Sequence, residues 1–464
     1  MEQLTQTLLP AVQTANSYLS DYVLLFLLVG TGLFFTFQTG FIQVRCLGEG
    51  FRQVFGGLSF RGKQQQGGMS SFQALATAIA AQVGTGNIVG AAGALLTGGP
   101  GAIFWMWVIA FLGMATIYAE AVLAQKTRVR DEEDQILGGP VWYIRRAFPN
   151  RFGRFLAGFF AVALILALGF LGSMVQSNSI GAAFETAFGL PSWLAGAVLV
   201  VLGGFIFLGG VQRLANVTEK LVPAMAGLYL LGGVIVLVSR AQYVGEAFGM
   251  IFRYAFAPHA ILGGAAGAAL KAAVSQGAKR GLFANEAGMG STPHAHALAN
   301  VKTPHQQGCV AMVGVFIGTF CIVTVTALVM IVTLYTGGGP LAQPGAGALA
   351  HELGLNQSNL AQTAYSEVFG PAAGRIFIAV ALFFFAFSTI LSWNLFGRLN
   401  AQYLFGRRAV LPYTVLSLVF LFVGTVTSAD LVWGLADLFN QLMVLPNVIG
   451  LIGCAGLVKE LTKQ

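Results

Sequence analysis

The stretch Gln82-Val83-Gly84-Thr85-Gly86-Asn87 interrupts an apolar segment that runs from about residue 70 to residue 97. An uncharged apolar segment of this length is typical of a membrane-spanning helix. Glycine lowers the cost of leaving helical geometry, and backbone inside a membrane must be hydrogen-bonded or line a cavity. The stretch therefore predicts a broken transmembrane helix whose freed backbone groups face a binding site.

The composition places the rest of the chain in lipid. Only 9% of the residues are charged and 56% are hydrophobic, with a mean hydropathy of +0.75, whereas a soluble domain carries roughly 25% charged residues. At about 20 apolar residues per crossing, the candidate spans lie at 21–39, 70–97, 102–124, 155–174, 192–210, 221–238, 261–285, 308–333, 375–394, 409–426 and 431–457. We expect an all-α membrane protein with eleven transmembrane helices.

Lysine and arginine are concentrated in the loops that follow odd-numbered spans, for example Arg45 and Arg52 after the first and Lys126 and Arg128 after the third. Cytoplasmic loops carry this excess in membrane proteins. The pattern places the N-terminus outside and the C-terminus in the cytoplasm. It also explains the net charge of +8, so we expect no nucleic-acid partner.

The cysteines give no sign of a metal or redox centre. Cys46, Cys309, Cys321 and Cys454 are scattered without paired spacing, and three of them fall in or beside apolar spans. Cysteine in such places behaves as a small core residue. We expect these four to do the same.

The seventh span is the other glycine-rich and polar one, with Ser275-Gln276-Gly277 in its middle and Asn285-Glu286-Ala287-Gly288 at its end. Being five spans after the second, it crosses the membrane in the opposite direction. Paired interrupted segments of opposite direction are typical of inverted-repeat transporters. The predicted units are a first helix and cytoplasmic loop at 1–69, a first repeat at 70–238, an outer connection at 239–260, a second repeat at 261–457 and a cytoplasmic tail at 458–464.

The freed groups of the broken second span favour a charged solute. N–H groups at the start of a half-helix favour an anion, and free carbonyls favour a small cation. Alternatively, Gly84, Gly86 and Gly90 form a packing seam for a neighbouring helix. The polar side chains of Gln82 and Thr85, which are costly in lipid, argue against that.

Neutral oxygens are the expected cation ligands, because no acid lies within the second span. Hard cations accept hydroxyl and carbonyl ligands, and Ser388 and Thr389 in span nine offer hydroxyls. These hydroxyls could instead bond only within their own helix. Asp437, in span eleven, is either functional, as intramembrane acids generally are, or part of a buried structural hydrogen bond.

Two rival functions are disfavoured. An intramembrane enzyme would need an acid, a base and a nucleophile that converge at one depth, but Glu120 and Glu286 sit at helix ends. A channel would show a pore-lining motif repeated across subunits. Gln176 and Asn178, at the outer end of span four, either line an access path or cap the helix at the interface.

Six blocks of sequence, in order, resemble the alanine or glycine:cation symporter family of bacteria and archaea. They are 84–87, 98–107, 113–120, 280–288, 385–390 and 445–447. The resemblance implies a LeuT-type fold, with one extra N-terminal helix before two inverted five-helix repeats. It also implies a monomer in the bacterial inner membrane that takes up alanine, glycine or their D-isomers with sodium or protons, and that needs no cofactor besides the coupling ion.

The resemblance also assigns roles to single residues. Amides of Thr85 and Gly86 would hold the substrate carboxylate, and Asn87 would support the unwound turn or a second ion. The residues expected to face the substrate are Gln82, Ser275, Gln276 and Gly277. The expected sodium ligands are the carbonyls of Ala80 and Val83, together with Ala386, Ser388 and Thr389.

Three positions depart from the family pattern. Gly318 stands where an Asp is expected, Arg398 where a Glu commonly follows span nine, and Leu391 where Gly is usual. The missing acid in span eight leaves the coupling ion open between sodium and a proton.

Overall fold

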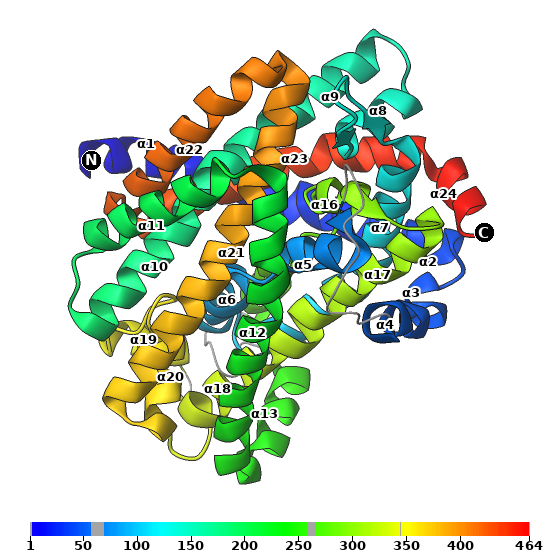
Figure 1. The fold of residues 1–464 in the computed structure, drawn as a ribbon. Coiled ribbons are helices and arrows are strands. Elements are labelled where there is room, and N and C mark those ends of the chain that lie inside the picture. The colour runs from blue at the N-terminus through cyan, green and yellow to red at the C-terminus, as the bar shows by residue number, and fades with distance from the viewer. Residues whose placement is uncertain (1, 57–68, 258–265, 344, 464) are drawn as a thin grey trace.

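The computed structural model describes residues 2–56, 69–257, 266–343 and 345–463, and these are mostly helical (Figure 1). The strands in the described residues are very short. A parallel pair joins β1 (Met69–Ser70) to β4 (Ala299–Asn300), and an antiparallel pair joins β2 (Val129–Arg130) to β3 (Ile136–Leu137). The predicted helical class is confirmed.

Seven helical stretches in the described residues are long and apolar enough to cross a membrane, and a bent pair makes an eighth. The seven are α7 (Gly101–Thr127), α9 to α10 (Arg151–Phe188), α12 (Gly210–Ser239), α17 to η5 (Pro304–Tyr335), α21 (Pro371–Phe405), η6 to α22 (Arg407–Val426) and α23 (Ala429–Gly453). The bent pair is α5 (Ser71–Gln82) with η2 (Gly86–Gly90) and α6 (Ala91–Gly98).

Three further helices occupy the places of the remaining predicted spans. They are the shorter apolar helices α2 (Leu25–Gln38) and α11 (Ser192–Phe207), and the more polar α15 (Ala266–Asn285). The predicted start of the seventh span at 261 lies outside the described residues, as do residues 57–68 of the first loop. The other elements are α1 (Glu2–Tyr18), η1 (Leu19–Leu24), α3 (Ile42–Arg45), α4 (Leu47–Gly56), α8 (Pro140–Ala147), α13 (Ala241–Tyr254), α16 (Pro293–Leu298), α19 (Ala346–Glu352), α20 (Leu360–Phe369) and α24 (Ala455–Leu461).

The prediction of 155–174 for the fourth span is too short at both ends. The helical stretch runs from Arg151 to Phe188, past the polar run that begins at Gln176. Gln176, Ser177 and Asn178 are buried inside the protein, so their polarity reflects internal contacts and does not mark a membrane surface.

Burial separates central from peripheral helices. In the most apolar stretch of each helix, 72% is buried in α7 and in α21, but only 33% in α12 and in α22. Large apolar side chains on the outer helices are exposed, including Val201, Phe205 and Val238. Figure 1 shows α12 at the front of the molecule with α5 and α6 behind it. The exposed apolar faces fit contact with lipid, and the broken helix lies behind them.

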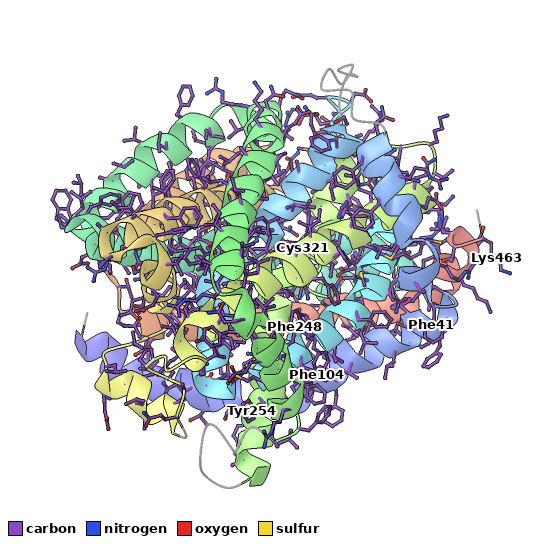
Figure 2. All side chains as sticks on the ribbon, turned by 90° about the horizontal axis from the view of Figure 1, so that it is seen from below. Phe41, Phe104, Phe248, Tyr254, Cys321 and Lys463 are labelled. Atoms are coloured by element: carbon purple, nitrogen blue, oxygen red, sulfur yellow. The ribbon has the colours of Figure 1, made fainter. Side chains whose placement is uncertain are left out.

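Close backbone contact joins α7 to the end of α13. A Cβ on Gly101 would collide with the carbonyl group of Tyr254, and the Trp105 indole donates to the Ala255 carbonyl at 2.9 Å. Figure 2 shows Phe104 and Tyr254 near each other at this contact. The N-terminal end of the central helix α7 is thereby fixed.

Candidate functional site

The helix break in the second span lies where the sequence predicts it. A capping box of Ser70 and Gln73 starts α5, and the helix ends at Gln82. Helical structure resumes at Gly86 with the π-helical turn η2, and the two halves are bent by 46°. The interruption therefore covers Val83, Gly84 and Thr85.

The glycines of the break are also packing positions. A Cβ on Gly84 would collide with the Thr389 hydroxyl of α21 and lie 3.1 Å from Oε1 of Gln176 in α10 (Ser173–Phe188). A Cβ on Gly86 would lie 2.7 Å from Cδ1 of Phe283 in α15. The break and the packing seam, which the sequence presents as alternatives, thus use the same residues.

Side chains bind the N–H groups freed by the break. The Thr85 amide donates to Gln176 Oε1 at 3.1 Å, and the Gly84 amide donates to Asn87 Oδ1 at 3.1 Å. Asn87 in turn donates through Nδ2 to the Gly318 carbonyl at 3.0 Å. Asn87 therefore closes the turn and ties it to η4 (Phe316–Val323).

The carbonyls freed by the break surround one hydroxyl. Thr389 Oγ1 lies 2.7 Å from the Ala80 carbonyl oxygen and 3.4 Å from that of Val83, and 3.0 Å from the carbonyl oxygen of Phe385 in its own helix. The hydroxyl has a single proton, so it can donate to only one of them at a time. The structure thus brings together three of the expected sodium ligands, Ala80, Val83 and Thr389.

The other two expected sodium ligands are placed differently. The Ser388 hydroxyl lies 2.9 Å from the Phe385 carbonyl oxygen and 3.5 Å from Sδ of Met225 in α12, so it bonds within its own helix and faces α12. Ala386 is buried in the same turn of α21. Thr389 alone of the two hydroxyl residues contacts α5.

The interruption expected at Ser275-Gln276-Gly277 is absent. Helix α15 is continuous from Ala266 to Asn285. Gly277 allows close helix packing and does not break the helix: a Cβ on Gly277 would collide with Trp105 and lie 2.8 Å from the Ala102 carbonyl oxygen of α7. Ser275 lines a cavity beside Leu25, and Gln276 lines a different cavity.

The chain instead breaks after Asn285. Glu286, Gly288 and Gly290 have positive φ angles of 57°, 91° and 79°, which glycine adopts readily and glutamate rarely. The chain then resumes as the short helix α16. The sequence signal for this second break is the motif Asn285-Glu286-Ala287-Gly288, in which polar residues stand close to a glycine.

A buried carboxylate from α7 holds the second break. Glu120 accepts hydrogen bonds from the amides of Gly288 at 3.2 Å and Gly290 at 2.9 Å, and from Asn447 Nδ2 at 2.6 Å. Tyr143 donates to Asn447 in turn. Sequence reasoning placed Glu120 at a helix end and missed this role.

The second carboxylate at this break is Glu286 itself. Trp393 of α21 donates to it through Nε1 at 2.6 Å, and the Ser291 hydroxyl also donates to it. Each oxygen of Glu120 and of Glu286 therefore accepts a hydrogen bond. This fixes the backbone of the second break in its unusual conformation.

The two breaks meet at Gln82, whose Nε2 donates to the Asn285 carbonyl at 2.9 Å. Within the described residues, four buried polar atoms at or beside the breaks have no hydrogen-bond partner: Gln82 Oε1, which faces Gly314 of α17, Thr85 Oγ1, Gln176 Nε2 and Asn285 Nδ2. Each such atom costs about 1–3 kcal/mol when unpaired. The first break therefore presents an incomplete polar environment that a polar ligand would complete.

A cavity of about 440 Å³ lies near the break, and its lining includes Gln276, Arg280, Trp433 and Asp437. Arg280 pairs with Asp437 at 3.6 Å, and its guanidinium carbon lies 4.7 Å from the centre of the Trp433 ring. Trp433 packs on Phe283, with ring centres 5.1 Å apart. Because Phe283 also touches Gly86, these side chains lie between the cavity and the break, and Asp437 takes part in an ion pair.

The model of the sodium:alanine symporter family matches residues 5–464. This chain belongs to that family. It is 39% identical over 453 residues to the sodium/alanine symporter AgcS of Methanococcus maripaludis, covering 97% of this chain and 96% of that one. It is 37% identical over 436 residues to the amino-acid carrier protein AlsT of Bacillus subtilis, covering 93% of this chain and 87% of that one.

Solved structures confirm the fold of this family member. MhsT in complex with L-phenylalanine superposes with a TM-score of 0.57 at 12% identity, covering 86% of this chain and 99% of that chain. A manganese transporter of Eremococcus coleocola superposes with a TM-score of 0.52 at 15% identity, covering 81% of this chain and 76% of that one. The expected LeuT-type fold is therefore confirmed. Membership of the sodium:alanine symporter family, together with the apolar spans, makes the protein a multi-pass membrane transporter and not an enzyme.

Proposed function

We propose that this protein takes up small neutral amino acids, namely alanine, glycine, D-alanine or D-serine, together with sodium by alternating access. The single observation that carries the proposal is that polar atoms of Gln82, Thr85 and Gln176, at or beside the first break, are buried without a hydrogen-bond partner among the described residues. A zwitterionic solute supplies both the acceptors and the donors that these atoms lack. Proton coupling is the alternative for the driving ion.

In this proposal, the substrate carboxylate binds the amides of Thr85 and Gly86. Gln176 Oε1 accepts from the Thr85 amide, so this side-chain oxygen occupies a position from which a carboxylate oxygen could accept instead. Gln82 faces the substrate from the end of α5. Gln276 contributes from the cavity side, whereas Ser275 lines a different cavity and Gly277 packs against α7.

The sodium ion binds at the carbonyl side of the break, among Ala80, Val83 and Thr389, with Ala386 and Ser388 completing the set after a small rotation of α21. Ion binding would order the carbonyls that Thr389 now approaches. The substrate then binds to an already ordered turn, which couples the two events.

The proposed topology follows the charge pattern. Eleven crossings, an extra first helix before two inverted five-helix repeats, an outside N-terminus and a cytoplasmic C-terminus account for the basic loops. The cavity lined by Arg280 and Asp437 then faces outward. We propose that the protein works as a monomer in the bacterial inner membrane.

Uptake of labelled alanine into proteoliposomes tests the function. We expect accumulation when sodium is higher outside than inside, and none when sodium is equal on both sides and a proton gradient is imposed. Accumulation driven by the proton gradient alone would favour the alternative ion. A monodisperse preparation that accumulates alanine under neither gradient would refute the proposal.

A further inference from the structure

Four metal-binding side chains converge away from both breaks, where α4 packs against α17 (Pro304–Val315). They are Cys46, Glu49, His305 and Cys309, and their candidate ligand atoms all lie within 4.8 Å of one another. Two come from the segment that follows α2 and two from α17. The structure thus joins two cysteines that the sequence presents as unrelated core residues.

The histidine of the cluster is oriented as a metal ligand. Its Nδ1 is hydrogen-bonded to the Tyr118 hydroxyl at 2.6 Å. Its Nε2 is thereby directed at the other groups, 3.5 Å from Cys309 Sγ and 3.6 Å from the Glu49 carboxylate. Metal-bound histidines typically use one ring nitrogen for the metal and the other for such an orienting hydrogen bond.

Packing that involves none of the four side chains holds the two halves of the cluster together. A Cβ on Gly50 would collide with the Cys309 carbonyl and lie 2.9 Å from Cγ2 of Val313, so only glycine allows α4 to approach α17 this closely. One residue further on, the Phe51 ring meets the Phe316 ring edge to face at 5.4 Å. The cluster is therefore preorganised by the fold.

We propose that Cys46, Glu49, His305 and Cys309 bind a zinc ion. Two thiolates, an imidazole and a carboxylate form a tetrahedral set with bonds of about 2.0–2.3 Å, and thiolates select zinc over the hard cations sodium, magnesium and calcium. Binding releases the two thiol protons to solvent. The Glu49 side chain is 43% exposed, so it can swing inward to complete the set.

The consequence of this site is a cross-link within the fold. The ion ties the segment after α2 to the beginning of α17, at a place separate from the Thr389 carbonyl cluster. The site is therefore structural, and its metal is not the transported or coupling ion. If the site did not bind zinc, the proposed transport function would not be affected.

Cobalt substitution of the purified, reduced wild-type protein in detergent tests the proposal. We expect one equivalent of Co²⁺ to give the intense d–d bands of tetrahedral coordination and a thiolate charge-transfer band. One equivalent of Zn²⁺ should abolish both. A reduced protein that gives neither band, or only the weak bands of octahedral cobalt, overturns the proposal without any variant.

Variants then locate the ligands. Cys309→Ser and His305→Gln should weaken zinc binding at least tenfold in a competition assay with a chromophoric chelator. Cys321→Ser and Cys454→Ser are the matched controls, since their thiols lie outside the cluster, and should bind zinc as the wild type does. Equal zinc binding by Cys309→Ser and Cys321→Ser would show that the metal binds elsewhere and overturn the assignment.

Discussion

The break at Val83–Thr85 and the break after Asn285 are built from similar materials, glycine and amide side chains, but they differ in how their polar groups are satisfied. At the first, Gln82, Thr85 and Gln176 each retain an unpaired buried atom. At the second, Glu120 and Glu286 accept hydrogen bonds at every carboxylate oxygen. The two breaks therefore differ in their acids and not in every polar group: two fully bonded carboxylates hold the backbone of the second break, although Asn285 Nδ2 there is also unpaired among the described residues, whereas no acid holds the first.

The largest expected effect comes from removing a carboxylate that holds the second break. In Glu120→Gln, an amide NH₂ would face the amides of Gly288 and Gly290 or Asn447 Nδ2, which are all donors. We expect the variant to lose about 3 kcal/mol of stability, because buried donors are left unpaired. The thermal unfolding midpoint in detergent measures this loss.

The matched control for Glu120→Gln is Glu246→Gln, which changes an exposed acid on α13. It should unfold at the wild-type temperature. If Glu120→Gln also matched the wild type, the second break would not depend on its carboxylate, and the contrast between the two breaks would disappear.

A second prediction concerns the carbonyl side of the first break. Thr389→Val keeps the shape of the side chain but removes the hydroxyl that lies among the Ala80 and Val83 carbonyls. We expect the sodium concentration for half-maximal alanine uptake to rise at least tenfold, equivalent to about 1.4 kcal/mol of binding free energy. Uptake measured across a series of sodium concentrations decides it.

Thr389→Ser, which retains the hydroxyl, is the control and should stay close to the wild type. If Thr389→Val and Thr389→Ser showed the same sodium dependence, Thr389 would not belong to the ion site, and its hydroxyl would serve only a hydrogen bond within its own helix.

Sequence reasoning found the first break because its signal is local. Glycine, threonine and asparagine within one apolar span are anomalous whatever surrounds them. It misplaced the second break because Gly277 is equally anomalous in sequence, yet only the contact with Trp105 and Ala102 reveals its use for packing. The roles of Glu120 and Gln176 depend on partners far along the chain, and no local pattern predicts those.

The same reasoning explains the cysteines. Cys46 and Cys309 lie in separate spans or loops, and their spacing carries no signal. Their proximity arises from the helix packing around Gly50. A family resemblance could supply the LeuT-type fold, but neither the resemblance nor spacing could bring these side chains together.

A third prediction tests the unpaired atoms directly. In Gln82→Leu, the amide that donates to the Asn285 carbonyl and carries an unpaired Oε1 is lost. We expect a KM for alanine about tenfold higher, or an altered preference between L- and D-alanine, with normal folding, since an unsatisfied polar atom is removed along with one hydrogen bond. Competition of labelled alanine uptake by a panel of amino acids measures both.

Gln242→Leu, on the exposed side of α13, serves as the control for Gln82→Leu. An unchanged alanine KM and unchanged chirality preference in Gln82→Leu would mean that the solute binds without this side chain.

The smallest expected effect is at Gly318, beside the first break but outside its gap. A Cβ there would make ordinary contacts, 3.5 Å from the Ala284 carbonyl oxygen and 3.8 Å from Asn87 Nδ2, so Gly318→Asp should fold. Its carboxylate would add a negative charge next to Asn87 and provide the acid that the first break lacks. We expect an about threefold lower half-maximal sodium concentration, or uptake that becomes dependent on pH, because a nearby anion stabilises a bound cation. Gly318→Asn, with the same shape and no charge, should show neither change. If both variants behaved alike, volume and not charge would set ion affinity at this position, and the neutral oxygens around Thr389 would be sufficient on their own.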